Sequence, residues 1–278
     1  MKSKDHNNNN TVNLTMIVLG NIRFAETDET FVCATLDWWP PNKSDFGWHS
    51  WEKAGILNLN LDNTILVNAV KGVVIQNLSK KLKMGHILIR VAHIYGNISS
   101  NLKPYGPWVG ESGGAFNSGG KRVSSSFANG FWYLDQLGMT SKSGHQVFCR
   151  QTLIGGHYGL LDTTTFNPKP DYHSALLWSR LMGKNVLSAS HNASNSLRIY
   201  SHCSKNIKGI SVLIINLSNS TTFEVKFVLL NGTPLKLTET FDIPTLDPQL
   251  VNATSPIRVM PHSIVFAILE GFKATACG

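Results

Sequence analysis

The chain has 278 residues, 42% of them hydrophobic and 15% charged, so it can bury one large core or two ordinary ones and is too apolar to be wholly disordered. Its longest apolar stretches, such as residues 210–215, are too short to cross a bilayer, and we expect no transmembrane segment. The net charge of +8 favours an anionic partner: an acidic polysaccharide, nucleic acid or a membrane surface. Because the basic residues are scattered, without interleaved aromatics, we expect no nucleic-acid partner. Peripheral membrane association and the oligomeric state stay open.

The spacing of cysteine and histidine predicts no metal site. The four cysteines (Cys33, Cys149, Cys203 and Cys277) include no CxxC pair, and the ten histidines include no HExxH pattern. We therefore expect neither a metal nor a cofactor.

Glycosylation sequons indicate passage through the secretory pathway. The pattern Asn-x-Ser/Thr occurs ten times, at Asn9, Asn13, Asn42, Asn77, Asn97, Asn192, Asn216, Asn219, Asn231 and Asn252. The polar N-terminal stretch, however, has no apolar core of a signal peptide, so the two signals conflict.

In chain order, the first elements are a tail, two strands and a helix. Residues 1–11 are polar and asparagine-rich, and we expect them to be disordered. Residues 12–20 alternate as a half-buried strand does, and residues 31–36 form the apolar run of a buried parallel strand. Helical spacing of leucine and isoleucine predicts a helix over residues 57–70.

The pattern is sharper from residue 108 onward. A strand is expected to end at Glu111 and to enter the glycine-rich stretch 110–120. The elements expected next are a helix over 127–137, a strand over 146–154, and a helix over 172–182 that Pro170 and Asp171 begin and Gly183 ends.

After a boundary near residue 185, short strands separated by turns are typical of an all-β sandwich. They are expected over residues 197–203, 210–216, 223–230, 235–241 and 264–269.

Glu111 is the first candidate for chemistry. A carboxylate at the C-terminal end of a strand is where barrel enzymes place catalytic groups, and paired carboxylates carry out glycoside hydrolysis. The alternative is a carboxylate that caps a helix or pairs with a nearby cation. The glycine-rich stretch is not a phosphate loop, because Ala115 and Arg122 stand where that motif needs glycine and serine or threonine. Asp37 ends a strand, and Tyr158 follows one; either could touch a substrate or simply pack.

Several long motifs, in order, resemble plant heparanase-like proteins of glycoside hydrolase family 79. Residues 31–41, with Trp-Trp-Pro-Pro, resemble the first barrel strand, and residues 110–119 resemble the nucleophile segment. Further matching motifs lie at residues 131–138, 149–151, 156–159 and 167–172. The resemblance covers about residues 12–72 and 104–278.

This resemblance implies a (β/α)8 TIM-type barrel followed by a C-terminal β-sandwich that an N-terminal strand joins. It also implies retaining cleavage of bonds to glucuronic acid, with Glu111 as nucleophile. Asp37 matches a residue that faces the uronate site, and Tyr158, with Gly156 beside it, matches a substrate-binding tyrosine. Asn117 and Ser118 match the loop whose backbone holds the sugar carboxylate. The implied location is extracellular (cell wall), vacuolar or lysosomal.

The chain departs from this family in its barrel. The family's acid/base glutamate lies in an Asn-Glu dipeptide, and the sequence contains none. A sandwich of roughly 100 residues leaves about 160 for a barrel that needs about 200 or more. Residues 73–103 match no motif of the family. An internal deletion would explain these departures.

We accordingly predict four segments: a disordered tail (1–11), a strand that joins the sandwich (12–24), a truncated, incomplete barrel (25–185) and a β-sandwich (186–278). The function predicted is a glucuronide- or acidic-glycan-directed glycoside hydrolase, impaired because the acid/base segment is missing. The alternative is a non-catalytic carbohydrate-binding protein or vestigial splice form.

Overall fold

A computed structural model describes residues 10–37, 51, 54–55, 58–74, 106–228, 236–240, 248–252 and 255–278. The chain divides into two compact units. Unit 1 combines Met1–Phe24 with Leu181–Gly278, and unit 2 is Ala25–Arg180.

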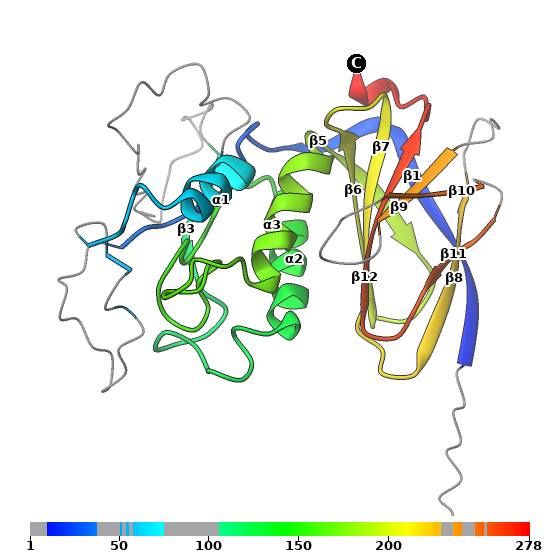
Figure 1. Cartoon of the computed structure of the whole chain (residues 1–278). Coiled ribbons are helices and arrows are strands. Elements are labelled where there is room, and N and C mark those ends of the chain that lie inside the picture. Colours follow the sequence, from blue (N-terminus) through cyan, green and yellow to red (C-terminus); the bar gives the residue numbers. More distant parts are fainter. Residues whose placement is uncertain are drawn as a thin grey trace, which may run out of the picture. The chain divides into compact units, whose positions relative to one another are not determined.

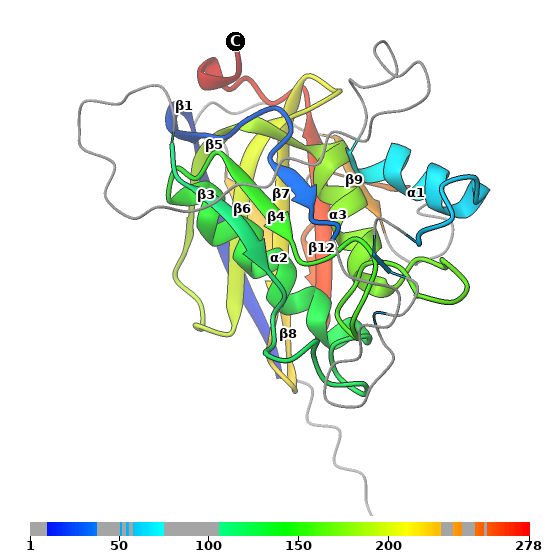
Figure 2. The same ribbon diagram turned by 90° about the vertical axis from the view of Figure 1, so that its left-hand side faces the viewer.

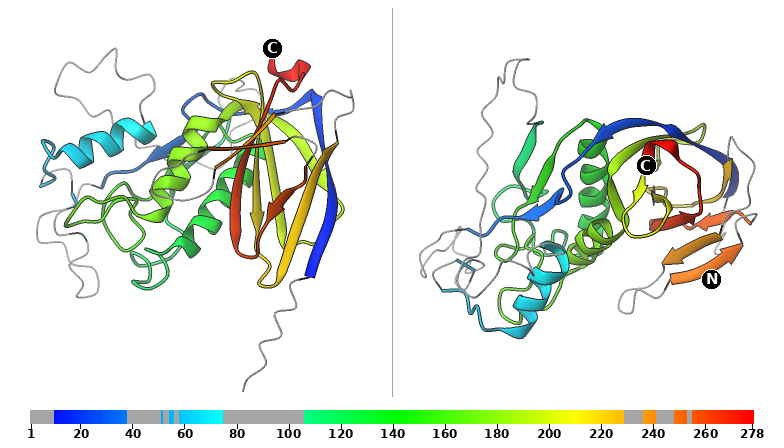
Figure 3. Two further views of the ribbon diagram at one scale, coloured as in Figure 1. Left: turned by 45° about the vertical axis from the view of Figure 1, so that its right-hand side comes forward. Right: turned by 90° about the horizontal axis from the view of Figure 1, so that it is seen from above.

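Unit 1 is a nine-stranded sheet in the order β10-β9-β12-β7-β6-β5-β1-β8-β11 (Figure 1). Its strands are β1 (Asn10–Glu26), β5 (Met182–His191), β6 (Leu197–Ser204), β7 (Gly209–Asn216), β8 (Thr221–Val228), β9 (Lys236–Thr240), β10 (Pro248–Asn252), β11 (Ile257–Val259) and β12 (Ser263–Glu270). Seen from above in Figure 3, these strands curl round a common interior.

The N-terminal strand belongs to this sheet because of its alternating pattern. Leu14, Met16 and Val18 are buried, whereas the residues between them are exposed. β1 runs parallel to β8, with Val12 opposite Phe223 and Leu14 opposite Val225. This pairing joins segments about two hundred residues apart, so one sheet needs both ends of the chain.

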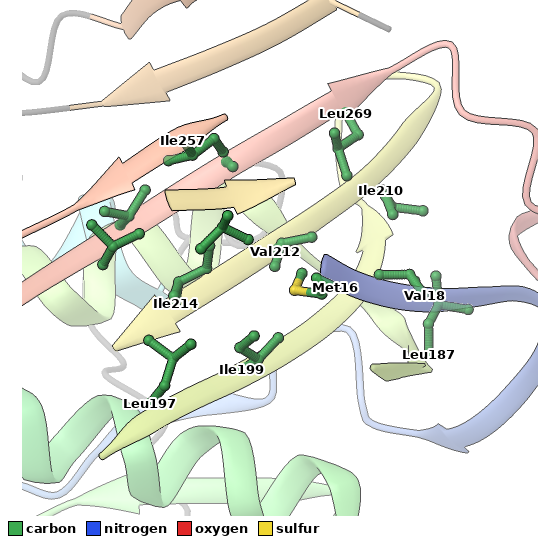
Figure 4. Close-up of a cluster of buried hydrophobic side chains, with 14 of the residues drawn as sticks. Met16, Val18, Leu187, Leu197, Ile199, Ile210, Val212, Ile214, Ile257 and Leu269 are labelled. Atoms are coloured by element: carbon green, nitrogen blue, oxygen red, sulfur yellow. The ribbon is translucent and has the colours of Figure 1, made fainter. Parts of the chain in front are cut away.

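Alternate residues of the strands build the core of unit 1. The cluster includes Met16, Val18, Leu187, Leu197, Ile199, Ile210, Val212, Ile214, Ile257 and Leu269 (Figure 4). A disulfide between Cys203 at the end of β6 and Cys277 holds the C-terminal segment, which includes the short helix η2 (Thr275–Cys277), to the sheet.

Unit 2 contains a parallel sheet in the order β2-β4-β3, and Figure 2 shows β3 and β4 side by side. Its elements are β2 (Val32–Ala34), α1 (Thr64–Val74), β3 (Trp108–Ser112), α2 (Phe127–Lys142), β4 (Val147–Arg150) and α3 (Pro170–Leu181). Helices α2 and α3 pack on this sheet through aromatic contacts. Tyr133 lies 6.0 Å from Phe148, and Trp178 lies 5.9 Å from Phe31, between ring centroids. A disulfide joins Cys33 to Cys149, which are opposite each other on β2 and β4.

Several element boundaries differ from those expected. The helix predicted over residues 57–70 begins only at Thr64. The Asn63 side-chain oxygen accepts hydrogen bonds from the backbone amides of Ile65 and Leu66 and so caps the helix there. Of the tail predicted over residues 1–11, residues 1–9 lie outside the described part, and Asn10 and Thr11 are in β1.

Two further boundaries have steric or hydrogen-bonding reasons. The strand predicted over residues 146–154 ends at Arg150, after which Ile154 and Leu161 form an isolated bridge. Gly183, expected to end a helix, instead lies within β5, where a Cβ would come 2.5 Å from the Cys203 carbonyl oxygen. The helix α3 therefore passes directly into a strand at Met182.

Candidate active site

Glu111 lies at the C-terminal end of β3, where the pairing with β4 is irregular. Val109 is opposite Phe148 and Ser112 is opposite Arg150, so β3 uses one residue more than β4 over this interval. Such a bulge re-aims a side chain, and bulges are common beside active sites. Gly110 is buried and the Glu111 side chain is exposed, so the carboxylate is accessible.

Asp37 follows β2 and lies within electrostatic reach of Glu111. The two strands flank β4 in a parallel sheet, so their C-terminal ends meet at one edge. Although Glu111 is exposed, the protein around it removes part of its hydration, which raises its pKa above the usual 4.5. The negative charge of Asp37 raises that pKa further. The structure thus brings together two carboxylates that the sequence placed 74 positions apart.

The loop after Glu111 rests on Tyr158. A Cβ added to Gly113 would lie 3.0 Å from the Tyr158 ring, and one added to Gly119 would lie 3.1 Å from it. Tyr158 is only 4% exposed. Glycines at these two positions therefore let the loop backbone approach an aromatic ring closely.

Asn117 and Ser118 adopt left-handed backbone conformations, with φ values of 50° and 63°. Non-glycine residues rarely adopt this conformation, because it costs roughly 1–3 kcal/mol each. It persists only where the surrounding contacts impose it. The Ser118 hydroxyl accepts a 2.6 Å hydrogen bond from the Trp51 indole, and its carbonyl accepts a 2.7 Å hydrogen bond from the His157 amide. Ser118 is buried, whereas the Asn117 side chain is exposed.

Gly156 lets the segment around residues 155–159 pack closely against the loop that contains Ser118. Its φ is 61°, and a Cβ there would lie 3.0 Å from the Ser118 carbonyl oxygen. The residues predicted from the family motifs are therefore neighbours: Glu111 precedes the loop, Ser118 and Gly156 touch, and Tyr158 supports the loop.

Positive charges lie beside this pair of loops. Burial lowers the pKa of His157, and the charges of Lys169 and Lys121 lower it further. The Lys169 ammonium donates a 3.3 Å hydrogen bond to the His157 carbonyl oxygen. A cationic environment of this kind favours an anionic ligand.

Sequence reasoning assigned no role to two groups at the site, although Arg150 lies in one of the matching motifs, at residues 149–151. Trp51 is buried and lies edge-on to Tyr158, with 6.3 Å between ring centroids, but it falls outside the motifs quoted above. Arg150 is fully buried and pairs with Asp171, with 3.0 Å between guanidinium nitrogen and carboxylate oxygen. Trp38 and Trp39, which follow Asp37 in the Trp-Trp-Pro-Pro motif, lie outside the described residues.

Within the described ranges, no group of three histidine, cysteine, aspartate or glutamate side chains could hold a metal ion. Among the helices that the structure describes, none is long and apolar enough to cross a membrane.

Comparisons with known proteins identify a family and several relatives. The family model "Glycosyl hydrolase family 79, N-terminal domain" matches residues 13–86 and 72–138. These matches include residues 73–103, in which we found no motif of the family. Over 260 residues the chain is 40% identical to "Heparanase-like protein 2" of Arabidopsis thaliana, covering 72% of this chain and 48% of the relative.

Two further relatives carry enzyme names. "Baicalin-beta-D-glucuronidase" of Scutellaria baicalensis is 39% identical over 189 residues, covering 59% of this chain and 36% of the relative. "Heparanase" of Bos taurus is 32% identical over 205 residues, covering 61% and 37%.

The matches and the carboxylate at a parallel-strand end define the chain as a member of a glycoside hydrolase family. The chain belongs to glycoside hydrolase family 79, among its heparanase-like proteins, as the motifs indicated. It spans about half the length of the first curated relatives that it matches.

Proposed function

We propose that the chain is a heparanase-like glycosidase of retaining type that acts on β-linked glucuronic acid, with Glu111 as nucleophile. The observation that carries this proposal is the position of Glu111 at a strand-end bulge beside Asp37. In a double displacement, a carboxylate oxygen of Glu111 attacks the anomeric carbon, and the glycosidic bond breaks. Water then releases the sugar from the enzyme ester.

The uronate carboxylate is held by the loop that contains Asn117 and Ser118. Backbone N–H groups bind carboxylates through charge-assisted hydrogen bonds, and the nearby cations Lys121 and Lys169 add attraction. Asp37, Gly156 and Tyr158 complete the substrate site. Converting the sugar carboxylate to a methyl ester should weaken binding; equal affinity for acid and ester would remove this role from the loop.

The acid/base is absent, so activity is impaired. No Asn-Glu dipeptide exists in the sequence, and a general acid typically contributes about 10²–10⁴-fold. An internal deletion in the barrel accounts for this. The alignment with Heparanase-like protein 2 runs over 260 residues but uses 72% of this chain, about 200 residues, so about 60 positions of the relative have no counterpart. Sequencing the cDNA across residues 72–104 tests the deletion directly.

The test of function compares two leaving groups. Nitrophenyl β-D-glucuronide needs little protonation and should react slowly, and methyl β-D-glucuronide should not react detectably. Azide should speed turnover, because an anionic nucleophile needs no general base. Glu111→Gln should abolish turnover, whereas Tyr158→Phe should only weaken it. Comparable rates on both substrates would show that another group serves as acid.

The missing acid/base also favours a second function, that of a non-catalytic carbohydrate-binding protein. It predicts that glucuronate-bearing glycans bind while neither substrate turns over, with or without azide.

The compartment that we propose is secretory and oxidising: the cell wall, a vacuole or a lysosome. All four cysteines are paired, as Cys33–Cys149 and Cys203–Cys277, and stable disulfides are rare in the cytosol. Ten sequons support the same compartment.

A further inference from the structure

The buried guanidinium of Arg150 joins the two segments that form the candidate site. One of its terminal nitrogens donates a 3.2 Å hydrogen bond to the carbonyl oxygen of Ser112, the residue after Glu111. The other donates a 2.7 Å hydrogen bond to the carbonyl oxygen of Tyr158. Two backbone segments from different parts of the chain are thus fixed by one rigid, planar group.

The guanidinium is itself held firmly. The Asp171 carboxylate lies 3.0 Å from it, and the same carboxylate oxygen accepts a 2.6 Å hydrogen bond from the Asn129 amide. Arg150 also lies over the rings of Trp132 and Tyr158, at 5.2 and 5.7 Å from their centroids. Because these contacts hold the guanidinium in place, it restricts the positions that the two backbone segments can take.

The glycine-rich loop rests on this arrangement. A Cβ added to Gly114 would lie 2.7 Å from Trp132 and 3.0 Å from the Asn129 side-chain oxygen. Gly113 and Gly119 lie against the Tyr158 ring. Three side chains against which the loop packs, those of Asn129, Trp132 and Tyr158, therefore contact Arg150 or the carboxylate that holds it.

We propose that Arg150 is a positioning residue, which fixes the backbone after Glu111 and the backbone at Tyr158 relative to each other. The proposal deepens the function proposed above and rests on it only for its catalytic consequence. Arg150 touches no substrate: it acts through the carbonyl oxygens of Ser112 and Tyr158.

Amide hydrogen exchange on the full chain tests the positioning without any need for activity. The reporters are the Gln151 amide, which donates to the Ser112 carbonyl, and the His157 amide, which donates to the Ser118 carbonyl. Both should exchange about tenfold faster, or more, in Arg150→Lys, because one ammonium cannot replace the two-pronged contact. The double variant Arg150→Met/Asp171→Asn removes both charges together, so neither is left buried alone, and should show the same loss.

Leu137→Ala is the matched control, because Leu137 is fully buried in α2 of the same unit and touches neither loop through any contact described above. It should speed exchange by general destabilisation, without singling out the two reporters. Wild-type exchange of both amides in the two Arg150 variants, or an exchange pattern equal to that of Leu137→Ala, would overturn the proposal.

The catalytic consequence is measured with 2-deoxy-2-fluoro-β-D-glucuronyl fluoride. Glu111 attacks its anomeric carbon, the carbon–fluorine bond breaks, fluoride leaves with the electron pair, and an ester forms. In Arg150→Lys the maximal labelling rate should fall about tenfold, since small displacements of reacting groups are costly, while the half-saturating concentration changes less. Wild-type labelling kinetics in this variant would contradict the positioning role. Failure of the wild-type chain to label would instead overturn the proposed function and leave the exchange result standing.

Discussion

Glu111 depends for its direction on the bulge in β3 and for its protonation on partial burial and on Asp37. Its candidacy could be predicted from the sequence, because a glutamate between an apolar strand and a glycine-rich turn leaves a readable pattern. The importance of Arg150 could not be predicted, because its partners Ser112 and Asp171 lie 38 and 21 residues away and it donates to three backbone carbonyl oxygens, those of Ser112, Gln151 and Tyr158. Backbone acceptors leave no trace in residue type.

At this scale the pH dependence of Glu111 labelling gives a prediction. The nucleophile must be ionised, so labelling should be lost as pH falls through the raised pKa of Glu111. Asp37→Asn removes one cause of that rise and should move the acid limb of the profile to lower pH. Asp135→Asn in α2 is the control and should leave the profile unchanged. An unshifted acid limb in Asp37→Asn would show that the two carboxylates do not interact.

At the scale of elements, the strands of unit 1 follow from periodicity. The pattern of apolar residues in the sequence predicts β6, β7 and β12 close to their observed bounds. The sequence does not show which strands pair with one another. The register of β1 on β8 depends on contacts between the two ends of the chain, which no local pattern encodes. The helix α1 was misplaced because the cap at Asn63 determined its start, whereas the apolar spacing extended further back.

His202 in β6 makes the sheet of unit 1 sensitive to acid. Burial lowers the pKa of His202 to about 4, and one ring nitrogen lies 2.6 Å from the Gly183 carbonyl oxygen. Between about pH 6.5 and pH 4, His202 therefore binds a proton in the unfolded chain but not in the folded chain. We expect this contribution to stability to be complete above about pH 6.5 and to be lost as pH drops toward 4, by up to about 3 kcal/mol.

The measurement is urea unfolding of wild type and His202→Gln at pH 7 and pH 5. The wild type should lose more free energy of unfolding between the two pH values than the variant does. Equal losses would show that His202 is not the group responsible.

The Cys203–Cys277 disulfide should stabilise unit 1 by shortening the unfolded chain. It closes a loop with a sequence separation of 74, for which chain entropy gives about 4 kcal/mol. Cys203→Ala/Cys277→Ala should lower the free energy of unfolding of unit 1 by a large part of that amount. Cys33→Ala/Cys149→Ala, in unit 2, is the matched control and should leave the unfolding of unit 1 unchanged. The reverse pattern would contradict this assignment.

At the scale of the whole molecule, the sequons whose side chains the structure describes separate into accessible and inaccessible ones. Asn13, Asn192 and Asn219 are exposed. Asn216 is fully buried, and its side-chain amide donates to the carbonyl oxygens of Thr221 and Met260, each at 2.8 Å. A glycan on Asn216 would break these contacts, so we expect none there in the folded chain.

The chain expressed with a secretory leader should therefore carry glycans at Asn219 and not at Asn216. Peptide mass mapping after enzymatic deglycosylation distinguishes the two. Asn219→Gln should remove one glycan and leave stability within about 0.5 kcal/mol, as for most surface changes. Asn216→Ala should leave glycosylation unchanged but destabilise the fold. A glycan on Asn216 of the folded, secreted chain would show that this side chain is not buried.

We propose above that Glu111 is a competent nucleophile in a site that lacks its acid/base. Incubation of the intact chain with 2-deoxy-2-fluoro-β-D-glucuronyl fluoride, followed by mass mapping of the peptides, tests it most directly, because fluoride leaves without help from an acid. We predict one label per chain, on Glu111, which glucuronic acid slows and Glu111→Gln prevents. A chain that stays unlabelled, or that carries the label on another carboxylate such as Asp37, would contradict the claim.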